Sequence, residues 1–161
     1  MGIEKDINQQ HFQSEAQKAM INLMYTHSWV TERIKEILAE ESITMQQFNI
    51  LRILRGSDPM PLSTLSIRER MLDKMSDTSR IVDRLLAKGL VDKKTCATDK
   101  RLVDVYITSE GKKLLEKLDN KSDVMNSITS KLSNSELEKL NELLDLLRTF
   151  KGKNPNPLFS F

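Results

Sequence analysis

The sequence predicts a mainly α-helical fold that contains one small β-hairpin. Three observations favour it: long segments with apolar residues three or four positions apart, two capping boxes that open such segments, and two adjacent β-type runs, 90–96 and 102–108. The helix before these runs carries short polar residues and arginines, and the turn between them is charged. This order is that of a winged helix-turn-helix, which can place one helix and one loop in neighbouring DNA grooves.

Length and composition exclude several classes of protein. A chain of 161 residues can bury a core without disulfides, and its single cysteine, Cys96, excludes an intramolecular disulfide framework. No apolar run approaches the roughly 20 residues of a membrane helix, and the N-terminus lacks the apolar segment of a secretory signal. We therefore expect a cytoplasmic protein without a membrane partner.

The net charge of +2 is distributed unevenly. Residues 1–67 carry 6 basic and 8 acidic side chains (net −2), and residues 114–161 carry 7 of each (net 0). Residues 68–113 carry 12 basic and 8 acidic side chains (net +4). The positive charge thus lies on the predicted helix and wing, as DNA binding would require, although an ordinary solvated surface is the alternative.

Four helices are predicted before the hairpin. The first spans about 10–41, and at roughly 45 Å it is longer than a small domain needs. The second opens at Thr44 with a capping box to Gln47, and Ser63 caps a short third helix. The fourth is expected over about 74–88, capped by Asp73 and ended by a glycine.

Two further helices follow the hairpin. Thr108 is expected to cap a helix that runs to about Lys131, and Ser133 and Glu136 form a second capping box before the last helix. The terminal helices have more apolar surface than a core of about 90 residues needs, so we expect them to pair with those of a second copy. The predicted organisation is a dimerisation helix over 1–42, a winged helix-turn-helix over 43–111, dimerisation helices over 112–151 and a tail over 152–161.

Five short motifs follow one another over residues 43–118. They are Thr44-Met45-Gln46-Gln47-Phe48, Ser79-Arg80-Ile81-Val82-Asp83-Arg84-Leu85, Lys88-Gly89-Leu90-Val91, Asp99-Lys100-Arg101 and Val105-Tyr106-Ile107-Thr108-Ser109-Glu110-Gly111. In order and spacing the chain resembles the MarR (multiple-antibiotic-resistance regulator) family of winged helix-turn-helix repressors. It departs from the family pattern before the fourth helix, where residues 68–75 are bulky and lack the usual glycine.

The resemblance implies a site on double-stranded DNA. The fourth helix would read the major groove, and Arg101 at the wing tip would enter an A·T-rich minor groove, with Asp99 orienting the wing. The expected DNA-binding residues are Lys74, Ser76, Asp77, Thr78, Ser79, Arg80, Arg84, Asp99, Lys100 and Arg101. The implied function is that of a homodimeric, ligand-responsive repressor in a bacterial cytoplasm, acting on a pseudo-palindromic operator with half-sites roughly 34–36 Å apart.

Several residues keep a second interpretation. Arg80 and Arg84 could form ion pairs on a solvated helix, and Arg101 could be an ordinary turn residue. Tyr25, His27 and Trp29 could line an effector pocket, although plain packing is favoured. Cys96 is expected to be inert rather than a redox switch.

No catalytic motif, metal-ligand spacing or cofactor-binding loop is present, so neither an enzyme nor a cofactor is expected. The alternative function is a helical protein–protein interaction module without specific DNA binding.

Overall fold

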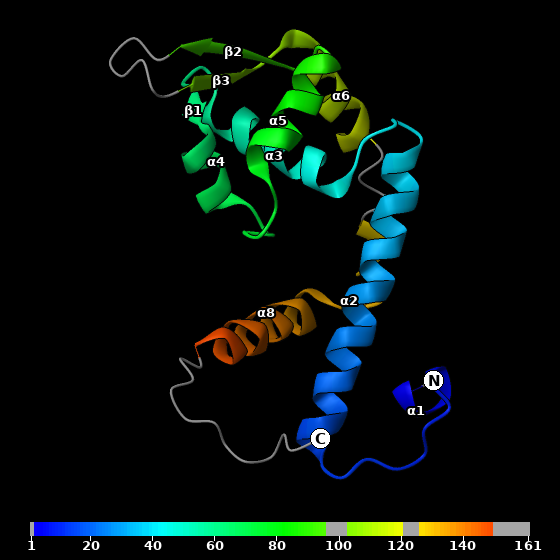
Figure 1. Ribbon diagram of the computed structural model, residues 1–161. Coiled ribbons are helices and arrows are strands. Elements are labelled where there is room, and N and C mark those ends of the chain that lie inside the picture. Colours follow the sequence, from blue (N-terminus) through cyan, green and yellow to red (C-terminus); the bar gives the residue numbers. More distant parts are fainter. Residues whose placement is uncertain (1, 96–102, 121–125, 150–161) are drawn as a thin grey trace. The chain divides into compact units, whose positions relative to one another are not determined.

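The computed structural model describes residues 2–95, 103–120 and 126–149 (Figure 1). The chain forms two compact units, Met1–Val124 and Met125–Phe161. In the first unit the helices are α1 (Ile3–Asp6), α2 (Glu15–Ala39), α3 (Met45–Ser57), α4 (Thr64–Arg70), α5 (Thr78–Ala87) and α6 (Ser109–Asp119), and the strands are β1 (Leu62–Ser63), β2 (Val91–Thr95) and β3 (Val103–Ile107). The described helix of the second unit is α8 (Asn134–Arg148).

The three strands form one antiparallel sheet in the order β1-β3-β2. Val91 pairs with Ile107 and Lys93 with Val105 across the hairpin, while Leu62 of β1 pairs with Val105 on the other side of β3. In Figure 1 the hairpin projects from the body of helices α3 to α6. The predicted hairpin is confirmed, and β1 is an addition that the sequence did not reveal, because two residues are too few to show a period.

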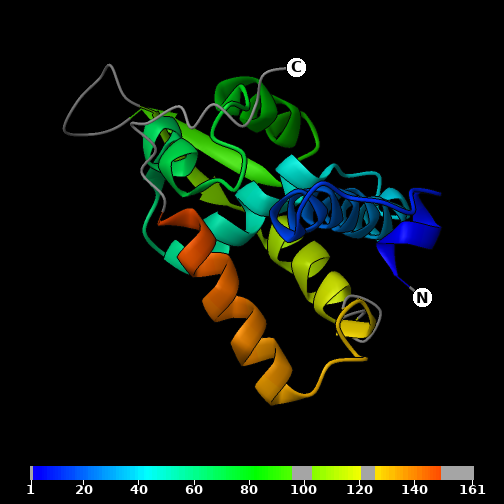
Figure 2. The same ribbon diagram turned by 90° about the horizontal axis from the view of Figure 1, so that it is seen from below.

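One hydrophobic core joins the helices to the sheet. Its buried members come from α3, β1, α4, α5, both hairpin strands and α6: Ile50, Leu51, Leu54, Leu62, Ile67, Met71, Val82, Leu85, Val91, Val105, Ile107 and Leu115. Helix α2 behaves differently, since only Ile37 and Leu38 at its C-terminal end are buried. It runs away from this body in Figure 1 and is foreshortened in Figure 2. The mainly α, winged helix-turn-helix fold is thus confirmed.

Four of the predicted helix caps are confirmed. Thr44 and Gln47 form the capping box of α3, with hydrogen bonds of 3.1 and 3.2 Å between backbone N–H groups and side-chain oxygens. Ser133 and Glu136 form the same device at α8. Ser63 caps α4 and Thr108 caps α6. Such caps form locally because a short polar side chain satisfies a backbone donor three residues away.

The predicted start of the fourth helix is wrong. Helix α5 begins at Thr78, and its cap is Asp77, whose carboxylate accepts a hydrogen bond of 3.1 Å from the backbone N–H of Arg80. Asp73 instead accepts from the backbone N–H of Met75 at 3.0 Å and from the hydroxyl of Ser76 at 2.7 Å. Residues 73–76 therefore form a turn, because an aspartate carboxylate can close a turn as readily as it opens a helix.

Two other predicted boundaries are wrong. Helix α6 ends at Asp119 rather than near Lys131, and residues 128–131 form turns. Asp119 and Asn120, at this end of α6, are of residue types whose side chains compete with the helix by bonding to nearby backbone. Helix α2 is also shorter than predicted, because Ser14 caps it and accepts a hydrogen bond from Gln17 N–H at 3.1 Å.

Candidate nucleic-acid interface

Helix α5 presents one polar face because its other face lies in the core. Val82 and Leu85 are fully buried, and the helix packs against α3, α4 and β2. Six residues are left exposed on the outer face. Two of them are apolar, Leu86 and Ala87, and four are polar: Ser79, Arg80, Asp83 and Arg84. Hydroxyls and guanidinium groups on one short helix can donate hydrogen bonds to base edges and phosphates.

Thr78 does not belong to this outer face. Only 5% of the residue is exposed, and its hydroxyl lies 3.4 Å from both the sulfur of Met71 and the carbonyl oxygen of Ser76. These contacts point the hydroxyl toward the turn before α5. Thr78 is therefore buried beside the turn in this conformation, and its predicted DNA contact stays a prediction.

Lys74 and Ser76, which were expected on the helix, lie in the turn that precedes it. The carbonyl of Lys74 accepts a hydrogen bond of 3.3 Å from Nε of Arg68 in α4, while the lysine residue itself is exposed. Asp77 is exposed, but its carboxylate is engaged in the cap. The turn therefore brings a cation to the N-terminal end of α5, the end that recognition helices point at bases.

The C-terminal end of α5 is fixed by backbone geometry. Gly89 adopts a left-handed φ of 69°, which lets its N–H bond to Leu86 O at 2.9 Å and the N–H of Leu90 bond to Leu85 O at 3.0 Å. This pair of hydrogen bonds ends the helix and turns the chain into β2. The glycine that the sequence predicted as the helix stop is confirmed.

An ion pair joins the outer face of α5 to the hairpin. Nζ of Lys93 in β2 contacts Oδ1 of Asp83, and the lysine side chain is only 24% exposed. On β2, Lys94 also lies over the ring of Tyr106 in β3, with Nζ 5.3 Å from the ring centroid. The first contact links the hairpin to the helix, and the second joins the two strands of the hairpin.

Four of the residues singled out in the sequence lie outside the described residues. They are Cys96, Asp99, Lys100 and Arg101. Their predicted roles in the wing stay predictions.

The three residues proposed for an effector pocket do not share a face. Tyr25 and Trp29 lie one helical turn apart on α2 and are each 40% exposed, whereas His27 lies about 200° around the helix from Tyr25. The guanidinium of Arg33 lies 5.9 Å from the Trp29 ring centroid. This arrangement brings together the two aromatic rings but not the histidine.

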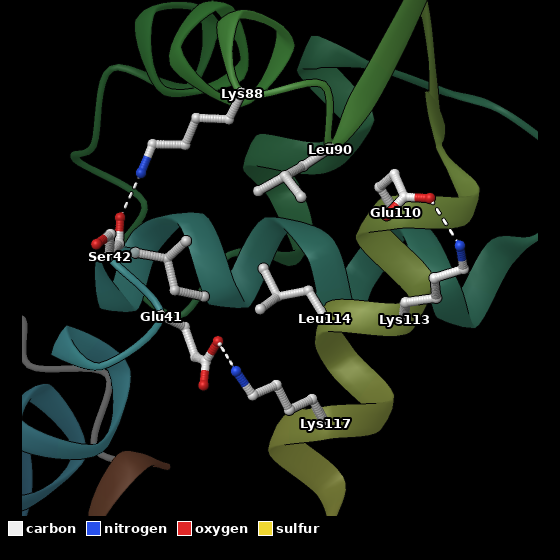
Figure 3. Close-up of a pocket in the computed structure, with 9 residues that line it drawn as sticks. Glu41, Ser42, Lys88, Leu90, Glu110, Lys113, Leu114 and Lys117 are labelled. Carbon is white, nitrogen blue, oxygen red and sulfur yellow. Dashed lines mark hydrogen bonds and ion pairs between the residues drawn. The ribbon is translucent and has the colours of Figure 1, made fainter.

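A different cleft lies where α2, α5 and α6 meet (Figure 3). Its volume is about 600 Å³, and it is lined by Glu41, Ser42, Ile43, Lys88, Leu90, Glu110, Lys113, Leu114 and Lys117. Neither Tyr25 nor His27 nor Trp29 is among these residues. The sequence could not reveal the cleft, because its walls come from three segments far apart in the chain.

Polar contacts in this cleft connect the end of α2 to α5 and α6. Nζ of Lys117 in α6 lies 2.8 Å from the carboxylate of Glu41, whose side chain is only 8% exposed. Nζ of Lys88, after α5, donates to the carbonyl oxygen of Ser42. On the same rim a hydrogen bond to Glu110 holds the pKa of Lys113 above its usual value.

Comparison with known proteins identifies the chain. A model described as the MarR family matches residues 43–103. A MarR transcription factor from Planctomyces limnophilus is 31% identical, with a TM-score of 0.65 over 84% of this chain and 99% of that one. The chain belongs to the MarR family. This MarR-family protein is therefore a DNA-binding transcription regulator, and its family is one of transcription factors rather than enzymes.

Two further relatives have lower sequence identity. The HTH-type transcriptional regulator FarR of Neisseria gonorrhoeae is 29% identical over 111 residues, which cover 69% of this chain and 75% of FarR. A mutant MarR from E. coli, crystallised in complex with operator DNA, is 22% identical and has a TM-score of 0.75 over 86% of this chain and 99% of that one. No helix in the described ranges has the length and apolar character needed to cross a membrane.

Proposed function

We propose that this MarR-family protein is a homodimeric repressor that binds a pseudo-palindromic operator in a bacterial cytoplasm. The single observation that carries the proposal is the outer face of α5, where Ser79, Arg80 and Arg84 are exposed on a helix fixed at both ends. The operator complex of the E. coli relative supports it, because that protein shares the fold. Arg80 would contact bases and Arg84 phosphate, and the wing tip would supply Lys100 and Arg101.

Dimerisation is supported by the apolar side chains that the terminal helices leave exposed. On α2 these include Met20 (47%), Met24 (65%) and Trp29 (40%), and on α8 they include Leu143 (52%) and Leu146 (66%). Runs of large apolar side chains on the surface of one chain indicate a protein interface. We assign residues 1–42 and 112–151 to this interface and residues 43–111 to DNA binding.

Ligand response is assigned to the cleft shown in Figure 3. A ligand there would compete for Lys117 with Glu41 and for Lys88 with the Ser42 carbonyl. Either exchange loosens the connection between the dimerisation helix α2 and the DNA-binding elements. A shift of a few ångströms in the spacing of the two recognition helices would then prevent them from engaging both half-sites at once.

Fluorescence anisotropy tests the proposal. The protein is titrated onto the DNA upstream of its own gene and onto a scrambled duplex, at two salt concentrations. We expect selective binding of one dimer per site that weakens steeply with salt, because phosphate contacts release counterions. Arg80→Ala and Arg101→Ala should each cost about 1–3 kcal/mol, whereas Lys153→Ala in the tail, outside the regions assigned to dimerisation and DNA binding, serves as a charge-matched control.

Absence of binding at low salt would overturn the proposal and favour the alternative of a protein–protein interaction module. A monomer in analytical ultracentrifugation at micromolar concentration would overturn the dimer.

A further inference from the structure

The turn before α5, residues 71–77, exposes two large apolar side chains. Met75 is 91% exposed and Leu72 is 86% exposed, the highest values among the large apolar residues that the structure describes. The neighbouring Met71 is only 3% exposed and belongs to the core. The turn thus buries one apolar side chain and holds two others almost wholly in solvent.

Polar contacts hold this turn, so the exposure is built into its backbone. Oδ1 of Asn49 in α3 accepts a hydrogen bond of 2.9 Å from the backbone N–H of Leu72. The carboxylate of Asp73 accepts from the backbone N–H of Met75 at 3.0 Å. Arg68 donates to the carbonyl of Lys74 between them. Each bond holds a peptide group of the turn in place beside an exposed apolar side chain.

The charges around the turn favour an anionic partner. Arg70, Lys74 and Arg80 are exposed and have no ion-pair partner within 4 Å in the described ranges. Of the carboxylates nearby in the sequence, Asp73 and Asp77 accept hydrogen bonds from the turn and from the start of α5, while Glu69 in α4 is exposed beside Arg70. Three cations without an ion pair therefore flank the apolar pair along the chain, and this combination suits a polyanion that also presents apolar groups.

Met75, one residue of the apolar pair, lies beside the outer face of α5. Met75 lines a shallow groove together with Leu65 of α4 and with Ser76, Asp77 and Ser79 at the start of α5. In Figure 1 the turn lies at the end of α5 opposite the hairpin. The DNA major groove offers one apolar group on a base edge, the C5-methyl of thymine.

We propose that Met75, with Leu72 beside it in the turn, contacts thymine C5-methyl groups in the major groove and gives the protein a preference for thymine next to the bases read by α5. The inference rests on the proposed function, since it requires operator binding. Methionine suits such a contact because its flexible, polarisable side chain adapts to the position of a methyl group.

The test removes a single methyl group from the DNA. A preferred duplex is first selected with the full-length protein from a pool of randomised sequences, and each thymine is then replaced in turn by deoxyuridine. We expect one or two replacements to weaken binding by about three- to fivefold, as the loss of one buried methyl predicts. Met75→Ala should bind the thymine duplex more weakly by a similar factor and should lose nothing further on the deoxyuridine duplex.

Two variants make the result specific. Met75→Leu should keep the sensitivity to deoxyuridine, because it keeps an apolar side chain. Met60→Ala, at a methionine that is 69% exposed before β1, should leave both affinities unchanged. Met75→Ala should also unfold at the wild-type temperature, because its side chain makes no core contact.

Equal loss by Met75→Ala on both duplexes would overturn the inference, since the side chain would then contact the DNA backbone. A change in sedimentation without a change in DNA affinity would also overturn it and would make the turn a protein contact. If no preferred duplex emerges from the pool, the proposed function itself fails. If a preferred duplex emerges and no deoxyuridine replacement lowers its affinity, this inference fails while the proposed function stands.

Discussion

Helices α5 and α8 carry apolar residues at similar helical spacing but place them in opposite environments. Val82 and Leu85 of α5 are fully buried, whereas α8 buries none of its 15 residues, and its Leu147 is 57% exposed. The apolar period predicts a helix equally well in both cases. It does not say where the covering surface lies, and for α8 the described residues of its own unit do not provide one.

The largest change in the free energy of unfolding is expected where α5 packs in the core. Leu85→Ala should lower the free energy of unfolding by about 2–5 kcal/mol, because it opens a cavity in a fully buried position. Chemical denaturation of the variant and of Leu86→Ala measures the effect. Leu86 is 40% exposed, so its truncation should cost less than about 1 kcal/mol. Equal losses from the two variants would contradict the burial described for α5.

On α8 the expected effect is on dimerisation. Leu143→Asp should raise the dimer dissociation constant about tenfold or more, since burying a leucine contributes about 1.5–3 kcal/mol. Sedimentation equilibrium at several protein concentrations measures it. Asn141→Asp adds the same charge about 200° around the helix and should leave dimerisation nearly unchanged. An unchanged dissociation constant for Leu143→Asp would remove α8 from the proposed interface.

A smaller effect is expected at the end of α5. Gly89→Ala should destabilise the protein by about 1–2 kcal/mol, because a φ of 69° brings a Cβ too close to the backbone. Gly56→Ala is the matched control: a Cβ at this helical position meets nothing within 4 Å. That change should be neutral or stabilise by up to about 1 kcal/mol. Thermal unfolding of both variants compares them, and a tolerated Gly89→Ala would show that α5 can end in another way.

The same contrast between local and tertiary contacts explains which features the sequence predicted. The caps at Thr44, Ser63, Thr108 and Ser133 were predicted because each joins residues three positions apart. The start of α5 was not, because Asp73 and Asp77 can both cap a helix. The choice between them depends on the contacts that Asn49 and Arg68 make with the turn from other helices.

The same division applies to the candidate site. The exposure of Ser79, Arg80 and Arg84 follows from the helical period once the buried stripe is assigned. The burial of Thr78 does not, since it depends on contact with Met71 from the preceding turn. The cleft and the exposed Met75 were also beyond prediction, because both depend on how separate segments meet.

The smallest expected effect concerns the pKa values of two carboxylates, one before α5 and one at the start of α8. The hydroxyl of Ser76 donates to Asp73 and holds the pKa of that carboxyl below its usual value, and Ser133 does the same for Glu136. A depressed pKa in the folded state means that the stabilisation is present above the unfolded value of about 4 and is lost as the pH falls through the folded value. Carboxyl NMR titrations should show both depressions.

Ser76→Ala should raise the pKa of Asp73 alone, and Ser133→Ala should raise that of Glu136 alone. Both hydrogen bonds are local, so the two regions should respond alike even though their tertiary environments differ. An ordinary pKa for Asp73 beside a depressed one for Glu136 would contradict the turn geometry. The exposure of Leu72 and Met75 would then lose its structural explanation, while the capping box of α8 would stand.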